Sequence, residues 1–307
     1  MHILISGGTG LIGRALCKYW LAQNHTLTVW SRRPQLVASL YGQQVRGVAS
    51  LEQMFEEPLD AIINLAGAPI ADWWWTTHRK RLLRNSRIGV TEQFVDWLTS
   101  RRQRPKLFIS GSAVGYYGDG KDCFLNEFSP PERNNFASEL CHAWETTAQR
   151  VESLDVRVVR LRTGLVLAAD GGFLKRLRLP FRCGLGGPLG DGNHWMSWIH
   201  LEDQVRLIDF LLHLPNAQGA YNACSPVPVR NIDFMRALGR TLQRPTLFRL
   251  PSVLLRTLFG ELAELLLSSQ RVIPARLQEA GYAFLFNDLD KAFCDLLQPT
   301  HTNSTTI

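Results

Sequence analysis

The sequence predicts an α/β protein built on a doubly wound parallel sheet, with a smaller second part beside it. Short apolar, β-branched runs alternate with segments whose apolar residues recur at helical spacing. A glycine-rich loop, SGGTGLIGR at 6–14, joins the first such run to the first helical segment. The chain has 307 residues, 45% hydrophobic and 20% charged, so it can bury the core of one large domain or two modest ones.

The predicted elements alternate along the chain as right-handed strand–helix–strand units require. Strands are expected at 2–6, 27–31, 61–67, 106–112 and 156–161, and helices at 11–23, at 77–101 in more than one piece, and at 136–152. The Gly- and Pro-rich stretch 171–195 is expected to be largely irregular around one short helix. A strand and helix at 197–213, a strand at 219–225 and helices beyond 231, among them 253–267, follow.

Charge and cysteine content narrow the class of protein. The net charge is +7, but the arginines are scattered in small groups, so solvated helix faces are expected and a nucleic-acid partner is not. The six cysteines show no C-x-x-C spacing or close pairing, so neither a metal site nor a disulfide framework is expected. No signal peptide precedes the first strand, and charged residues interrupt the apolar stretch 250–267. We therefore expect a cytoplasmic protein without a membrane partner.

The loop SGGTGLIGR indicates a dinucleotide site. Three glycines stand at G-x-x-G-x-x-G spacing between a strand and a helix, which allows a tight turn, a close approach of the backbone to a pyrophosphate, and close packing of helix on sheet. The free N–H groups at the start of the helix would face the phosphates. The residues expected to hold the cofactor here are Gly7, Thr9, Gly10, Leu11, Ile12 and Gly13.

The end of the second strand predicts which dinucleotide is bound. NAD-binding proteins usually place an acidic residue there for the ribose 2′-hydroxyl, whereas a 2′-phosphate favours arginine. The sequence reads Trp30-Ser31-Arg32-Arg33, without an acid. Ser31 and Arg32 are therefore expected to bind the 2′-phosphate of NADP(H), the alternative being that one or both arginines are simply solvated.

Several motifs together resemble a known family. GGTGLIG, NLAG at 64–67 and FISGSAVGYYGD at 108–119 resemble the extended short-chain dehydrogenase/reductases. SRIGVT at 86–91, PFRCGLGGPLGDGNHWMSWIHLED at 180–203, YNACSPVPV at 221–229 and GELAELLLSSQRVIPARLQEAGY at 260–282 resemble its atypical branch, the NAD-dependent epimerase/dehydratase-like "epimerase family". The resemblance implies a Rossmann fold with a small C-terminal domain from about residue 245.

The expected division of the chain follows from these assignments. The NADP-binding Rossmann domain is expected to comprise 1–165 and 198–236. The smaller part, on the substrate side, is expected to comprise 166–197 and 237–298. The segment 299–307 has no apolar pattern and is expected to be a disordered tail.

The resemblance implies a catalytic Ser, Tyr and Lys, and only the serine is present. Ser112 matches it, while the helix that should carry Tyr-x-x-x-Lys reads NNFASELCHAWE. One frame places Phe136 and Leu140 at the Tyr and Lys positions, and a shift of one residue places Ala137 and Cys141 there. Neither pair can transfer a proton in the usual way.

Other side chains are candidates for part of this site. Tyr116 and Tyr117 follow Ser112 and would supply a substitute phenol, although a packing role is the stronger expectation. Glu139 and His142 lie on the helix without the pair and more simply face solvent or a neighbouring helix. The family also implies that Leu65, Ala66, Arg87 and Leu161 lie near the cofactor.

The tryptophan cluster at 73–75 and the stretch 198–203 also carry candidate binding residues. Three adjacent indoles, Trp73 to Trp75, cannot all face one core, so at least one is expected to line a cleft or a partner surface. Asp203 is expected to cap the helix that follows it, and Trp198 or His200 to touch substrate only as the weaker alternative.

These observations leave two main hypotheses about function. The first is an NADP(H)-dependent oxidoreductase or epimerase-like enzyme that acts on a small molecule. The second is a non-catalytic NADP-bound sensor or partner-binding protein, which the missing Tyr and Lys favour. Nucleic-acid binding through the arginine-rich helix is a third, weaker alternative.

Overall fold

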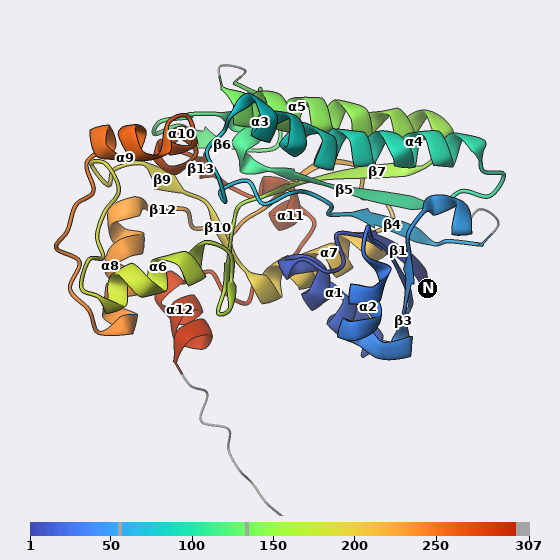
Figure 1. The fold of residues 1–307 in the computed structure, drawn as a ribbon, viewed down its shortest axis with the longest axis horizontal. Coiled ribbons are helices and arrows are strands. Elements are labelled where there is room, and N and C mark those ends of the chain that lie inside the picture. The colour runs from blue at the N-terminus through green and yellow to red at the C-terminus, as the bar shows by residue number, and fades with distance from the viewer. Residues whose placement is uncertain (55–56, 133–134, 299–307) are drawn as a thin grey trace, which may run out of the picture.

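A computed structural model describes residues 1–54, 57–132 and 135–298, and it confirms the predicted doubly wound α/β fold (Figure 1). Seven parallel strands form the main sheet in the order β11-β7-β5-β4-β1-β2-β3. The strands are β1 (His2–Ser6), β2 (Thr26–Trp30), β3 (Val45–Val48), β4 (Ala61–Asn64), β5 (Leu107–Ala113), β7 (Arg157–Thr163) and β11 (Gly219–Ala223). The strand order reverses between β1 and β4, which is where such sheets bind ligands at their carboxyl ends.

Strand β3 is absent from the sequence prediction. It is four residues long, VRGV, and pairs only with β2 at the edge of the sheet. Its second residue, Arg46, is exposed, and the third is Gly47. A Cβ atom on Gly47 would lie 2.9 Å from the Pro34 carbonyl oxygen. The strand therefore depends on tertiary packing against the preceding helix, α2 (Pro34–Tyr41), rather than on a recognisable apolar run.

Helices cover both faces of the sheet. On one face α1 (Leu11–Leu21), α2 (Pro34–Tyr41) and α7 (Leu201–His213) pack over a core that includes Trp20, Val29 and Leu207. On the other face α4 (Val90–Ser100) and α5 (Phe136–Gln149) cover Leu4, Ile62 and Phe108. Short turns of helix, η1 (Gly42–Gln44), η2 (Leu51–Met54), η4 (Val114–Tyr117) and η5 (Arg150–Leu154), join these elements.

The expected interruption within 77–101 is confirmed. α3 (Thr77–Arg84) is followed by a π-helical turn, η3 (Asn85–Gly89), and then by α4. The Thr76 side chain caps α3 by accepting a hydrogen bond from the Arg79 amide. The π-turn carries Arg87, and such turns often occur at functional sites.

A second, smaller core lies beyond the sheet. α6 (Gly172–Arg182), α8 (Asn231–Leu242) and α12 (Leu289–Leu297) enclose residues such as Leu174, Phe234 and Phe293. The remaining elements are β6 (Phe124–Leu125), β8 (Leu165–Ala168), β9 (Trp195–Met196), β10 (Trp198–His200), β12 (Val229–Arg230), α9 (Ser252–Phe259), α10 (Leu262–Leu267), β13 (Arg271–Val272) and α11 (Ala275–Glu279). Because α8 packs in this core, the expected boundary at 236 falls inside a helix of the smaller part.

Two local predictions were wrong. The helix expected at 253–267 is divided into α9 and α10 at Gly260, whose φ of +55° lies in the left-handed region that ends helices. Asp203 does not cap α7, because His200 holds that position and accepts from the Glu202 amide. Asp203 is instead completely buried and accepts from the amides of Leu285 and Phe286 at 2.9 and 2.8 Å.

The next features are membrane-spanning helices, metal-binding clusters, cysteines and the C-terminal segment. In the described residues no helix is long and apolar enough to cross a membrane, and no cluster of His, Cys, Asp and Glu suits a metal ion. All six cysteines have free thiols. The expected disordered tail, 299–307, lies outside the described residues.

Candidate cofactor and active site

The glycine loop is built so that only glycine fits at its two ends. Gly7 has φ of +75°, and a Cβ atom there would lie 2.6 Å from the Leu65 carbonyl oxygen. A Cβ atom on Gly13 would lie 2.3 Å from the Gly7 carbonyl oxygen. The Gly10 amide donates to the same oxygen at 2.9 Å and closes the turn. The loop, the start of α1 and the end of β4 therefore pack backbone against backbone.

The first turn of α1 is open to an anion. Gly10 stands at the N-cap, with no side chain to satisfy the first amides and no acidic residue in the first turn. Thr9 and Ile12 are half-buried. The Leu11 side chain packs against Gly171, where a Cβ atom would lie 2.6 Å from it, so the start of α6 approaches the loop. This arrangement fits a dinucleotide pyrophosphate, held by main-chain N–H groups.

Ser31 and Arg32 lie at the carboxyl end of β2, next to this loop. The Ser31 amide donates to the Val48 carbonyl at 3.0 Å, which fixes the turn, and the Ser31 hydroxyl accepts from the Arg33 amide at 3.1 Å. Arg32 and Arg33 are exposed. The turn therefore presents positive charge, and no carboxylate, where β2 ends.

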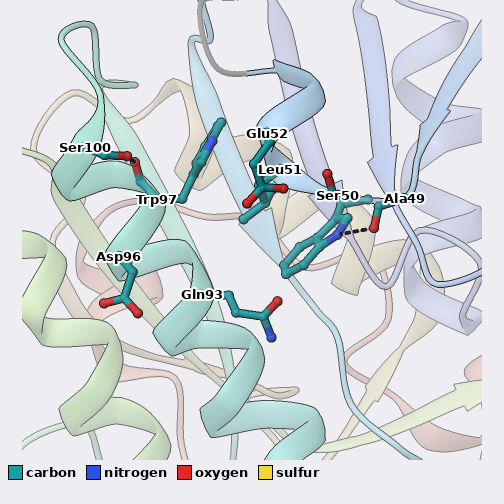
Figure 2. A pocket seen from close by; sticks show the side chains of 9 residues that line it. Ala49, Ser50, Leu51, Glu52, Gln93, Asp96, Trp97 and Ser100 are labelled. Carbon is teal, nitrogen blue, oxygen red and sulfur yellow. Dashed lines mark hydrogen bonds between the residues drawn. The ribbon is translucent and has the colours of Figure 1, made fainter.

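A pocket of about 390 Å³ lies beside this turn, between the ends of β2 and β3 and the helix α4 (Figure 2). The Trp30 indole forms one wall and donates to the Ala49 carbonyl at 3.1 Å. Glu52 and Asp96 are the charged residues of the lining, and both are acidic. The pocket is therefore unsuited to a phosphate.

Arg87 approaches the strand end that faces the glycine loop. Its guanidinium donates to the Ala68 carbonyl at 3.0 Å and lies 3.0 Å from where a Cβ atom on Gly67 would stand. Burial lowers the pKa of Arg87. Leu65 and Ala66 are half-buried directly after β4. The structure thus brings Gly7, Leu65 and Arg87 together at the switch point of the sheet.

Ser112 belongs to a buried network of charged groups at the end of β5. Its hydroxyl donates to Glu145 Oε1 at 2.7 Å. Arg162 donates to both oxygens of Glu145, at 2.8 and 2.9 Å, and Arg160 lies 3.7 Å from the same carboxylate. Ser112, Glu145 and Arg162 are each 5% exposed or less. Burial by itself would lower the pKa of Arg162, but the bonds and charge of Glu145 outweigh it and hold that pKa above its usual value.

The two tyrosines that follow Ser112 have different environments. Tyr117 is buried, its hydroxyl donates to Asn222 Oδ1 at 2.7 Å, and it accepts from Arg162 at 2.9 Å. Burial raises the pKa of Tyr117 in spite of Arg162. Tyr116 is half-buried, and the Arg162 guanidinium stacks on its ring at 3.5 Å. Tyr116 is therefore the more accessible phenol of the two.

The structure distinguishes the two frames considered for the missing Tyr and Lys. Phe136 and Leu140 pack with Trp75, Leu83 and Leu262, in a cluster that also includes Ala137. Ala137 and Cys141 lie against Gly115, at 3.7 and 3.8 Å from where its Cβ atom would stand. Ala137 and Cys141 share a helix face with Glu145, four residues further on.

Cys141 does not provide a reactive thiolate at this position. The side chain is 5% exposed, and burial raises the pKa of the thiol to about 12. The two α5 positions that lie against Gly115 thus hold a methyl group and a neutral thiol.

The remaining predicted residues lie in different surroundings. The Leu161 side chain is completely enclosed in the core and presents no surface at the carboxyl edge of the sheet. Glu139 pairs at 3.4 Å with Arg84. Trp198 is completely buried and donates to the Val227 carbonyl, and His200 stacks on Phe286. His142 lies 6.3 Å from Tyr116, measured between ring centroids.

Sequence reasoning missed Glu145, Arg162 and Asn222, which complete the network around Ser112. A signal was present for one of them, because Arg160 and Arg162 stand two residues apart in β7, on either side of the apolar Leu161, and so share one face of the sheet. Glu145 and Asn222 gave no such signal in the sequence. Each is a polar residue that becomes buried only when the elements of the fold pack together.

The fold and this site define a nicotinamide-dinucleotide-binding protein of the extended short-chain dehydrogenase/reductase type. Residues 3–224 match the NAD dependent epimerase/dehydratase family, and residues 250–296 match a domain of unknown function (DUF1731). The chain belongs to this epimerase family, as the sequence resemblance predicted.

Relatives match along almost the whole chain. The epimerase family protein Mb2239 of Mycobacterium bovis is 40% identical over 292 residues, which cover 94% of this chain and 95% of that protein. The chloroplastic SDR39U1 homolog of Arabidopsis thaliana is 35% identical, with coverage of 97% and 87%. The crystal structure of human epimerase family protein SDR39U1 with NADPH is 31% identical, with a TM-score of 0.86 and coverage of 96% and 99%.

Proposed function

We propose that this chain is an NADP(H)-dependent oxidoreductase of the epimerase family that acts on a small molecule. The observation that carries the choice of cofactor is the turn after β2, where Ser31, Arg32 and Arg33 offer a hydroxyl and two exposed guanidinium groups. A 2′-phosphate gains charge-assisted hydrogen bonds from such a turn. The similarity to a human protein whose crystal structure contains NADPH supports this proposal.

The residues at the carboxyl edge have distinct roles in this proposal. The amides at the start of α1 hold the pyrophosphate and Arg32 holds the 2′-phosphate. A bound nicotinamide supplies or accepts the hydride. Ser112 uses its only proton in the bond to Glu145, so its free lone pairs accept a hydrogen bond from a substrate hydroxyl. We assign the proton exchange with that substrate to Tyr116, because it is less buried than Tyr117.

A titration with Arg32→Gln tests the cofactor assignment. NADPH fluorescence and calorimetry would measure binding to the wild type, to Arg32→Gln and to the control Lys18→Gln on the outer face of α1. We expect NADPH affinity to fall about 10- to 100-fold in Arg32→Gln, as loss of a charge-assisted bond implies, while NADH affinity is unchanged. Equal affinity of the wild type for the two cofactors would contradict the assignment.

One observation favours a second candidate function, a non-catalytic NADP-bound sensor. The face of α5 toward Gly115 carries Ala137 and Cys141, neither of which donates a proton near neutral pH. Stereospecifically deuterated NADPH and a panel of carbonyl compounds distinguish the two functions. Deuterium in an alcohol product supports the enzyme, whereas tight NADPH binding without any transfer supports the sensor.

A further inference from the structure

The connection between β4 and α3 ends in an exposed aromatic tip. Trp73 and Trp74 are 71% and 66% exposed, and among the described residues neither ring stacks on another ring or cation. Trp75 anchors the tip, because it is 7% exposed, donates to the Ile70 carbonyl at 3.0 Å and packs edge-on against Phe136. The two outer indoles are therefore held in solvent by a rigid base.

The helix α6 and the segment that joins α9 to α10 lie next to this tip. Arg176 of α6 donates to the Ala71 carbonyl at 2.7 Å and pairs with Asp72, directly before the tip. On the other side, Phe259 and Leu262 pack in the same cluster as Trp75. Figure 1 shows α6, α9 and α10 at the same end of the molecule.

The helices α6 and α9, at the same end of the molecule as the tip (Figure 1), also carry exposed apolar side chains. Leu179 lies one turn beyond Arg176 on α6 and is 70% exposed. On α9, Val253, Leu254 and Leu258 are exposed to 73%, 43% and 46%. We call these four residues and the two outer indoles the apolar rim. Exposed apolar groups gathered at one end of a protein mark sites that bind proteins or membranes.

The charge around the apolar rim is positive. α3 reads THRKRLLR and α6 reads GFLKRLRLPFR, and neither contains an acidic residue. Five carboxylates nearby each form an ion pair with a cation of α3, α6 or α9: Asp72 with Arg176, Glu139 with Arg84, Asp170 with Arg178, Glu261 with Lys80 and Glu264 with Arg256. Arg81 of α3 and Lys175 and Arg182 of α6 are exposed and take part in none of these pairs, so the surface keeps an excess of positive charge.

We propose that the apolar rim docks the protein onto the surface of an anionic lipid bilayer. Tryptophan favours the bilayer interface, leucine and valine enter the acyl boundary, and lysine and arginine around them bind anionic headgroups. This docking differs from the sequence-based expectation of no membrane partner, which rested on the lack of an apolar span. It is independent of the function proposed for the carboxyl edge of the sheet.

Vesicle binding tests the proposal with the full chain. Sedimentation would use vesicles of phosphatidylcholine alone and of phosphatidylcholine mixed with phosphatidylglycerol, and brominated lipid would report contact with tryptophan. We expect binding to the anionic vesicles only, weakened by salt, with quenching of tryptophan emission. The double variant Trp73→Ser/Trp74→Ser should lose both signals, while Leu40→Ser, a 39% exposed leucine on α2, should retain them.

Charge reversal provides a second, matched pair of variants. Lys175→Glu on α6 should weaken vesicle binding about tenfold, as the removal of cations at an anionic surface implies, whereas Lys18→Glu on α1 should not. Absence of binding to anionic vesicles at low salt would overturn the proposal. So would a wild-type dimer that Trp73→Ser/Trp74→Ser dissociates, or binding to nucleic acid in place of lipid.

Discussion

The two halves of the carboxyl edge are built in different ways. At β1 and β4 the surface is made of backbone, since glycines at 7 and 13 allow three segments to touch. At β5 and β7 it is made of side chains, since Ser112, Glu145 and Arg162 bond to one another in the interior. The first half keeps its close backbone packing only where side chains are absent. The second half is stable only when each buried polar group has its hydrogen-bond partner. The two halves should therefore respond differently to substitution.

The largest expected effect is on the buried ion pair. Glu145→Gln leaves Arg162 buried beside a neutral amide and should lower the free energy of unfolding by about 3–5 kcal/mol. Glu139→Gln is the control on the same helix, because its partner Arg84 is half-exposed at 3.4 Å, and it should cost at most about 1 kcal/mol. Urea unfolding measures both. Equal effects would show that burial does not distinguish the pairs.

The next largest effect is expected from a substitution in the glycine loop, where the surface is made of backbone. Gly13→Ala would place its Cβ atom 2.3 Å from the Gly7 carbonyl oxygen and should cost about 1–3 kcal/mol while abolishing dinucleotide binding. Gly89→Ala makes the same change where no atom lies within 4 Å of the new methyl group. That variant should match or exceed the stability of the wild type. Thermal unfolding and NADPH titration test the pair, and retained binding in Gly13→Ala would refute the packing argument.

Substitution of Tyr117 is expected to change mainly the free energy of unfolding, and substitution of Tyr116 mainly the reaction. Tyr117→Phe removes a hydroxyl bonded to Arg162 and Asn222 and should cost about 1–3 kcal/mol. Tyr116→Phe should change the free energy of unfolding by less than about 0.5 kcal/mol, because Tyr116 is only half-buried. If Tyr116 exchanges the proton, its variant loses hydride transfer and remains folded. Full activity in Tyr116→Phe would exclude the role proposed for this phenol.

The smallest effect is a pH dependence in the smaller part of the chain. Burial lowers the pKa of His194 below its ordinary value of 6.5, although Asp191 and Asp119 oppose the shift. The unfolded chain then binds the proton more readily, so stability is present above about 6.5 and is lost as the pH falls below it. His194→Gln should reduce this slope, and the exposed His78→Gln should not. Urea unfolding at several pH values measures the difference, and an unchanged slope in His194→Gln would contradict it.

The sequence by itself determined the fold class, the glycine loop and the family. Each depends on local requirements that leave a mark on neighbouring residues: apolar periodicity for the strands and helices, and a missing Cβ for the loop at Gly7 and Gly13. The edge strand β3 left no such mark, because its register comes from pairing with β2.

Only the tertiary structure determined which side chains lie together at the carboxyl ends of β5 and β7. Whether Phe136 or Ala137 faces Gly115 depends on the rotation of α5, which packing against Trp75 and the sheet fixes. Glu145, Arg162 and Asn222 are far apart in the chain, and their bonds form only when β5, β7, β11 and α5 meet. Periodicity predicts that a residue is internal, but the partners of a buried charge are set by contacts between distant segments.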